Sequence, residues 1–86
     1  MELKDTINLM QSDDYRDRFR AEYWQTKIRY DKLHKMITRY EAGTLGFTPD
    51  CDMKILKSQA AAMEQYLYML EVRAEIEGIK LAEETE

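Results

Sequence analysis

Apolar residues recur at intervals of three and four along most of this chain, which is the spacing of one face of an α-helix. Two short interruptions divide the pattern into one short and two long segments. The expected helices cover about residues 3–10, 13–42 and 49–78. The sequence therefore predicts an all-α fold in a single domain, residues 1–86.

Residues typical of helix ends stand where these segments meet. Ser12 or Asp13 offers a side-chain oxygen to cap the start of the first long helix, and Gly43 suits the position just after its end. Thr48 and Pro49 are typical of the N-cap and first turn of the next helix. Because only a short loop joins the two long helices, we expect them to pack as an antiparallel hairpin behind the short N-terminal helix.

The last helix carries two apolar seams side by side. The first seam faces the hairpin and consists of Met53, Leu56, Ala60, Met63, Leu67, Leu70 and Ala74. Its counterpart on the first long helix consists of Phe19, Tyr23, Thr26, Tyr30, Leu33, Ile37 and Tyr40. The second seam consists of Ile55, Gln59, Ala62, Tyr66, Met69, Arg73 and Ile76. One broad apolar face is the alternative interpretation, but two helices are too thin to cover both seams, so we expect a homo-oligomeric helical bundle.

Composition supports a small folded protein that needs a partner chain. Charged residues make up 35% and hydrophobic residues 44% of the 86 positions, which fits a folded helical chain and not a disordered one. The single cysteine, Cys51, cannot form an internal disulfide, so a reducing cytoplasm is the simplest compartment. No apolar run approaches the ~18 residues that a membrane span needs, and the first ten residues lack a secretory apolar core. The acidic tail, residues 82–86, is expected to fray.

The residues needed for catalysis or metal binding are sparse. His34 is the only histidine and lies on a charged helix, so a surface position explains it. Cys51 has no neighbouring base, and HExxH, CxxC, EF-hand and ExxH patterns are missing from the sequence. We therefore expect no catalytic residues, no metal site and no cofactor, and a binding protein is favoured over an enzyme.

The charges are distributed unevenly along the chain. Residues 15–40 contain eight Lys or Arg and three Asp or Glu, whereas residues 64–86 contain seven acids, Arg73 and Lys80. The basic half can attract anions although the total charge is −4. The acidic balance opposes the long phosphate track that duplex DNA requires, so a small anionic ligand is the better candidate.

The segment Ser12–Trp24 places arginines among aromatic residues. Arg16 and Arg20 are neighbours on one helix face, and guanidinium groups bind phosphate with two parallel hydrogen bonds. Tyr15 and Tyr23 supply rings on which a base can stack. The alternative is an ordinary salt-bridged helix surface, because acidic residues nearby give every arginine a partner.

The motif Tyr15-Arg16-x-Arg18-Phe19-x-x-Glu22 opens the first long helix. After a short loop with Leu45 and Phe47, the return helix carries Leu56, Gln59, Met63, Tyr66, Leu70, Arg73 and Ile76. This pattern resembles a family of small helical-hairpin proteins of tailed and crAss-like phages. It is similar to the phage anti-CBASS cyclic-nucleotide sponges and to one anti-Thoeris sponge family.

The resemblance implies that the protein sequesters a nucleotide second messenger of bacterial defence in the cytoplasm of an infected host. It implies homo-oligomers, a hexamer or a dimer, with ligand pockets between subunits. Tyr15 matches the family's aromatic position, and Arg20, with Arg18 as an alternative, matches its basic position. Cyclic dinucleotides, cyclic trinucleotides and cyclic ADP-ribose isomers all remain open as ligands.

The resulting hypothesis assigns a role to each candidate residue. Tyr15 stacks on a base or ribose, and Tyr23 offers a second ring. Phosphates are held by Arg16, Arg18 and Arg20. Glu22 orients the arginines, while Tyr66 and Arg73 reach a neighbouring subunit's ligand from the second seam. Two rival hypotheses are a helical module that inhibits a host protein and a structural hairpin without a ligand.

Overall fold

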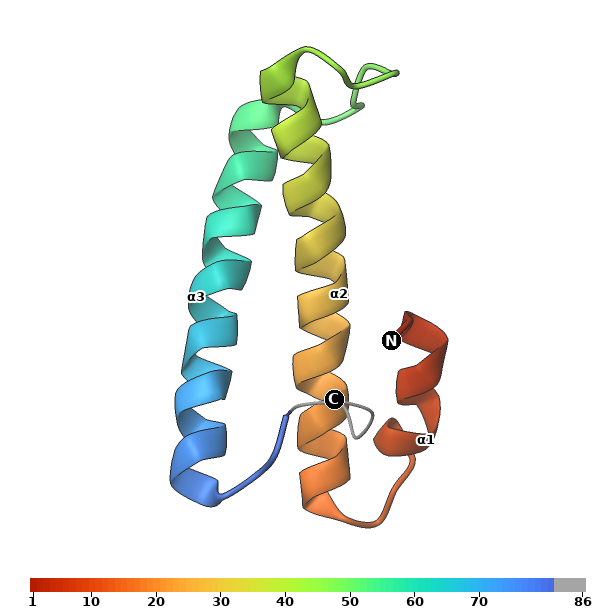
Figure 1. The fold of residues 1–86 in the computed structure, drawn as a ribbon, viewed down its shortest axis with the longest axis vertical. Helices are drawn as coiled ribbons and strands as arrows, with labels where there is room; N and C mark the ends of the chain where they lie inside the picture. Colours follow the sequence, from red (N-terminus) through yellow and green to blue (C-terminus); the bar gives the residue numbers. More distant parts are fainter. Residues whose placement is uncertain (82–86) are drawn as a thin grey trace.

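The computed structural model describes residues 1–81, and these form helices without any strand (Figure 1). A 3-10 turn, Leu3–Thr6, leads directly into the short helix α1, Ile7–Met10. The two long helices are α2, Tyr15–Ala42, and α3, Met53–Glu77. The all-α prediction is confirmed for this part of the chain, and the predicted acidic tail lies outside the described residues.

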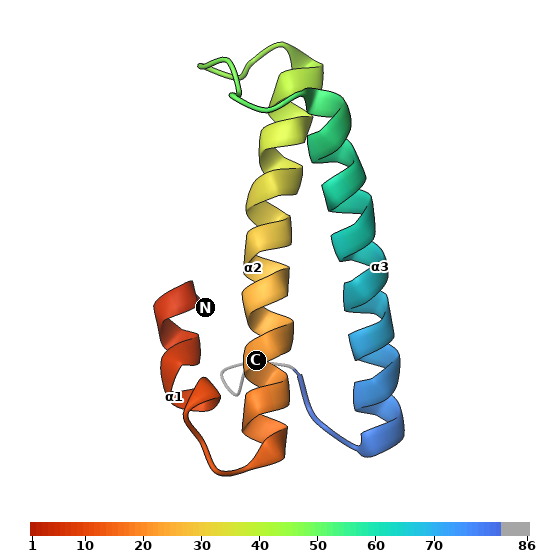
Figure 2. The ribbon, with the colours of Figure 1, turned by 180° about the vertical axis from the view of Figure 1, so that it is seen from behind.

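The long helices run antiparallel, and α1 packs on the other side of α2 (Figures 1 and 2). The molecule is elongated, with dimensions of 43 × 24 × 23 Å. As a result, α2 lies between two other elements of the chain. Helix α3 is covered by α2 on one side only (Figure 2).

Helix α2 begins at a cap built from two side chains. Asp14 Oδ1 accepts a hydrogen bond from the Arg16 backbone N–H at 2.9 Å, and Ser12 Oγ accepts one from the Asp14 backbone N–H at 3.0 Å. Asp14 is therefore the N-cap, one or two residues later than predicted, and Ser12 supports it. At the other end, Gly43 adopts a left-handed φ of 75°, the conformation that favours glycine after a helix.

Helix α3 begins four residues after the predicted Pro49. Asp52 is its N-cap, and its Oδ1 accepts a hydrogen bond from the Lys54 backbone N–H at 2.9 Å. Because proline fits a turn as well as a first helical position, Thr48 and Pro49 lie in the loop instead of the helix. Gly78, with a φ of 70°, ends α3 and turns the chain back towards α2.

The core lies where α2 begins and α3 ends. Its buried members are Phe19, Tyr23, Leu67, Leu70, Ala74 and Ile79. All except Ile79 belong to the two hairpin seams predicted from the sequence. Towards the loop the packing loosens, since Leu33, Ile37 and Leu56 are only half-buried and Tyr40 is exposed. Every residue of the second seam is exposed, so the hairpin alone leaves that seam uncovered.

Candidate functional site

Tyr15, at the first turn of α2, meets Arg73 and Glu77 from the last turns of α3. Arg73 Nη2 donates a hydrogen bond to the Tyr15 hydroxyl oxygen at 2.7 Å. That hydroxyl donates in turn to Glu77 Oε1 at 3.0 Å, and Arg73 Nε donates to Glu77 Oε2 at 3.3 Å. These three residues, with Phe19 beneath them, are called the Tyr15 cluster below.

Phe19 fixes the position of the charge in the Tyr15 cluster. The Arg73 guanidinium carbon lies 4.9 Å from the centre of the Phe19 ring, a cation–π contact. Desolvation alone would lower the pKa of Arg73, but its interactions with Tyr15 and Glu77 outweigh this effect and raise it. The Tyr15 ring packs edge-on against Phe19 and stays 47% exposed. The cluster therefore presents an open aromatic ring beside a held cation.

Arg16 and Arg18 differ in what they contact. Arg18 Nη1 donates to the Ser12 carbonyl oxygen at 2.7 Å and thereby closes the turn before α2. The Arg16 guanidinium is exposed, and within residues 1–81 it has no hydrogen-bond or ion-pair partner. Of the two, Arg16 is thus the arginine that can bind an anion without first breaking a contact.

Arg20 holds the segment that follows α3. Its Nε donates to the Lys80 carbonyl oxygen at 2.7 Å, and its Nη1 contacts Asp17 Oδ1 at 3.0 Å. Beside it, the Trp24 indole N–H donates to the Leu81 carbonyl oxygen at 2.8 Å. Residues 79–81, called the strap below, are therefore fastened to α2 by two side chains. This role for Arg20 was not visible in the sequence, because 60 residues separate the two partners.

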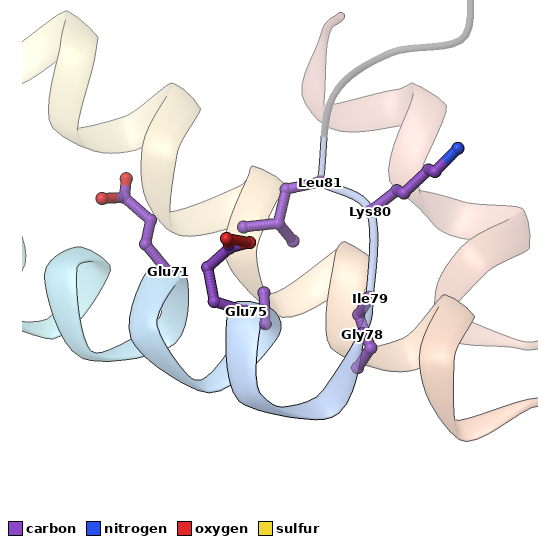
Figure 3. Close-up of a pocket in the computed structure, with 7 residues that line it drawn as sticks. Glu71, Glu75, Gly78, Ile79, Lys80 and Leu81 are labelled. Atoms are coloured by element: carbon purple, nitrogen blue, oxygen red, sulfur yellow. The ribbon is translucent and has the colours of Figure 1, made fainter.

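A hollow of about 440 Å³ lies between the strap and α3 (Figure 3). Its lining consists of Glu71, Ala74, Glu75, Gly78, Ile79, Lys80 and Leu81. Figure 3 shows that the Lys80 side chain extends away from Glu71 and Glu75. Two carboxylates thus dominate the charge of this hollow, which disfavours an anionic ligand there. None of the residues predicted from the sequence as ligand contacts lines it.

The remaining predicted residues lie apart from the Tyr15 cluster. Glu22 is exposed on α2, and Tyr66 is 38% exposed on the second seam; neither side chain has a hydrogen-bond partner within residues 1–81. Tyr23 is only 7% exposed, and its hydroxyl donates to Glu71 Oε2 at 3.0 Å. The structure therefore brings Tyr15 and Arg73 together and places Tyr23 in the core.

The pH dependence of the stability tests whether Tyr23 is buried in the core. Burial and the Glu71 carboxylate raise the pKa of Tyr23 to about 12, above the ~10 of an unfolded tyrosine. The unfolded chain therefore loses this proton first, and the stability from the Tyr23 contact is lost as pH rises from about 10 towards 12. Tyr23→Phe should cost about 0.5–1.5 kcal/mol at pH 8. Urea unfolding should show a smaller difference between the two proteins at pH 11, and an unchanged difference would contradict the buried contact.

Two structural features are absent from the described residues. Within residues 1–81, no helix combines the length and apolar character needed to cross a membrane. The same part of the chain contains no group of three or more His, Cys, Asp or Glu side chains placed to hold a metal ion. The candidate site is the Tyr15 cluster, because it places an exposed aromatic ring beside a held guanidinium.

Comparison with known proteins identifies the family. The model of the Sequestin family matches residues 13–76, about three quarters of the chain. The chain belongs to the Sequestin family. The name Sequestin indicates a protein that sequesters a ligand, which agrees with a binding role and not a catalytic one. The match includes Tyr15 and Arg73 but ends before Glu77 and the strap. No curated protein and no solved structure matches this Sequestin chain.

Proposed function

We propose that this Sequestin chain is a phage protein that binds a nucleotide-derived immune second messenger and keeps it from its effector without cleaving it. The ligand is a cyclic oligonucleotide or a cyclic ADP-ribose isomer, as in anti-CBASS and anti-Thoeris sponges. The protein acts in the cytoplasm of the infected bacterium. The observation that carries the proposal is the Tyr15 cluster, in which an open aromatic ring lies beside a fixed guanidinium.

The proposed contacts depend on which ring faces and guanidinium groups are free to bind a ligand. Tyr15 stacks on a base, which contributes about 1–3 kcal/mol in single-stranded nucleotide sites. Arg73 and Arg16 bind phosphate. The Arg16 guanidinium can do so without giving up a hydrogen bond or an ion pair. Arg18 and Arg20 are proposed phosphate contacts at the edge of the site, and each would exchange a carbonyl partner for the ligand.

Glu22, Tyr23 and Tyr66 have secondary roles in this proposal. Glu22 accepts hydrogen bonds from a base edge or orients the arginines. Tyr23 acts from the core by packing beside Trp24, with the two ring centres 5.2 Å apart. Tyr66 lies on the uncovered second seam, from which it reaches the ligand of a neighbouring subunit. The protein is proposed to be a homo-oligomer, a dimer or a hexamer, with its pockets between subunits.

A second candidate function is inhibition of a host protein through a helical face. The exposed second seam favours it, because exposed apolar stripes commonly mark protein interaction surfaces. The third hypothesis is a structural hairpin without a ligand. It is favoured by Arg18 and Arg20, because both already donate hydrogen bonds to carbonyl oxygens of the chain. A ligand that binds the purified protein separates the first function from the other two.

Thermal unfolding in the presence of candidate ligands tests the proposal. The purified protein is heated with each of a set of cyclic dinucleotides, cyclic trinucleotides and cyclic ADP-ribose isomers. A ligand at 100 times its Kd should stabilise the fold by about 2.7 kcal/mol and raise Tm, because only the folded state binds. AMP and ATP serve as controls that lack the cyclic linkage. If no cyclic nucleotide raises Tm more than these controls do, the proposal is wrong.

A further inference from the structure

The strap is anchored at its first residue and held by two side chains beyond it. Ile79 is 5% exposed, and its backbone N–H donates to a carbonyl oxygen of α3 at 2.9 Å. Within the described part of the chain, no backbone–backbone hydrogen bond involves Lys80 or Leu81. Their carbonyl oxygens accept hydrogen bonds only from the side chains of Arg20 and Trp24. The end of the strap can therefore leave α2 while Ile79 stays in the core.

The hollow behind the strap leaves room for this movement (Figure 3). Its volume of about 440 Å³ lies between the end of the strap and α3, so packed side chains do not back the strap on that side. Leu81 contacts the core but is only half-buried, and Lys80 is exposed. The two hydrogen bonds from α2 are thus the main polar contacts that keep the strap in place.

The Arg20 guanidinium has both of its binding edges partly occupied. Nη1 donates to Asp17 Oδ1 at 3.0 Å, Nε donates to the Lys80 carbonyl oxygen at 2.7 Å, and Nη2 makes no hydrogen bond within residues 1–81. A guanidinium binds phosphate through two parallel N–H groups along one edge, either Nε with Nη2 or Nη1 with Nη2. Each edge of Arg20 therefore includes a nitrogen that already has a partner.

The strap is the partner that an anion displaces more easily. Asp17 is charged, and its Oδ2 accepts a hydrogen bond from Ser12 Oγ at 2.8 Å, which holds the carboxylate beside Arg20. The Lys80 carbonyl is neutral, so a phosphate forms a stronger hydrogen bond with the guanidinium than this carbonyl does. The edge formed by Nε and Nη2 also points away from Nη1, so an anion bound there lies on the far side of the guanidinium from Asp17.

We propose that the strap competes with an anion for Arg20. A phosphate group that binds Nε and Nη2 replaces the Lys80 carbonyl, and Leu81 then leaves the Trp24 indole. Arg16 lies one turn earlier on α2, and its side chain has no hydrogen-bond or ion-pair partner among the described residues, so it adds a second positive charge. The inference rests on the proposed function for Arg20 as a phosphate contact, and it adds that this contact opens the strap.

The competition also selects among anions. A phosphate group offers two oxygens to the edge formed by Nε and Nη2, whereas a chloride ion can contact the free Nη2 alone and leave the strap closed. The apparent affinity for phosphate is reduced by the fraction of molecules in which the strap is open. A change that loosens the strap should therefore strengthen phosphate binding, although it removes contacts from the fold.

The indole N–H of Trp24 reports the position of the strap. Trp24 is the single tryptophan of the chain, so the NMR spectrum contains one indole signal. Inorganic pyrophosphate should move this signal upfield in a saturable manner, because the indole loses its hydrogen bond to the Leu81 carbonyl. Sodium chloride at the same ionic strength should leave the signal in place. A signal that pyrophosphate does not move, or that both salts move equally, would overturn the proposal.

Two arginine substitutions locate the effect. Arg20→Gln removes the guanidinium that holds the strap, so its indole signal should start near the shifted position and should not respond to pyrophosphate. Arg29→Gln is the matched control, because Arg29 is an exposed arginine of α2 without a printed role in the strap's two hydrogen bonds, and it should respond as the original protein does. Equal responses of the two variants would contradict a competition at Arg20.

Leu81→Ala tests the competition even if Arg20→Gln does not fold. It removes part of the strap's packing on the core, so the Kd for pyrophosphate, measured by isothermal titration, should fall below that of the original protein. An unchanged or higher Kd would refute the competition. A cyclic nucleotide that raises Tm while pyrophosphate leaves the strap closed would refute it and keep the proposed function. A pyrophosphate response without binding of any cyclic nucleotide would support the competition and count against the proposed ligand.

Discussion

Replacing Leu70 by Ala is expected to destabilise the fold by about 2–5 kcal/mol, the range for a buried leucine that leaves a cavity. Leu70 is 1% exposed and packs with Phe19, Tyr23 and Leu67 at the centre of the core. Proteins of this length are typically stable by about 4–13 kcal/mol, so this loss removes a large part of the total. Urea unfolding followed by circular dichroism gives the difference in free energy.

Tyr68→Ala is the control for this substitution. Tyr68 lies two residues before Leu70 on the same helix but is 65% exposed, so truncating its side chain should change the free energy of unfolding by less than about 0.5 kcal/mol. Equal effects for the two variants would mean that α2 and α3 do not pack through Leu70. Such a result would contradict the hairpin core.

Replacing Tyr15 by Ala is expected to weaken binding of the tightest cyclic nucleotide by about 5–150-fold, which corresponds to the 1–3 kcal/mol of one stacked base. The substitution also leaves Arg73 and Glu77 without the hydroxyl that joins them. Isothermal titration with the same nucleotide measures the change. Tyr15→Phe keeps the ring and removes only the hydroxyl, so it should retain most of the affinity if stacking dominates.

Tyr40→Ala is matched to Tyr15→Ala. Both tyrosines lie on α2 and both are 47% exposed, but Tyr40 lies at the opposite end of the helix. We expect no change in affinity for Tyr40→Ala. If the two alanine variants lose affinity equally, the aromatic ring of Tyr15 has no particular role, and the site has to be sought elsewhere on the molecule.

Helical periodicity and glycine made most of the fold predictable. The hairpin seams contain five of the six residues in the core cluster, and Gly43 and Gly78 lie just beyond the ends of the long helices. The start of α3 was not predictable in the same way. Thr48 with Pro49, and Asp52 four residues later, both have the chemistry of a helix start, and only the folded loop selects Asp52.

The candidate site was predictable only in its components. Tyr15 and Arg73 were each singled out, but no rule of spacing within one helix could show that residues 58 positions apart share a hydrogen bond. Glu77 and the strap were missed for the same reason. The strap in particular depends on carbonyl oxygens, which carry no signal in a sequence because every residue has one.

The arginines that interrupt an otherwise acidic chain now have separate explanations. Arg18 closes the turn before α2, and Arg20 fastens the strap, so both have structural roles that need no ligand. The Arg16 side chain has no hydrogen-bond or ion-pair partner within the described residues. The Arg73 guanidinium is held by contacts with Phe19 and Tyr15, and its residue is exposed. We therefore expect Arg16 and Arg73 to contribute more to binding of an anion than Arg18 and Arg20.

Recovery of intact nucleotide tests sequestration most directly. The protein is incubated with a cyclic nucleotide that raises its Tm, separated from free nucleotide, and heated to release what it holds. Mass spectrometry of the released material should find the original cyclic nucleotide, unchanged and in a fixed ratio to protein subunits. Release of a linear or otherwise altered product would make the protein an enzyme, and release of nothing would contradict sequestration.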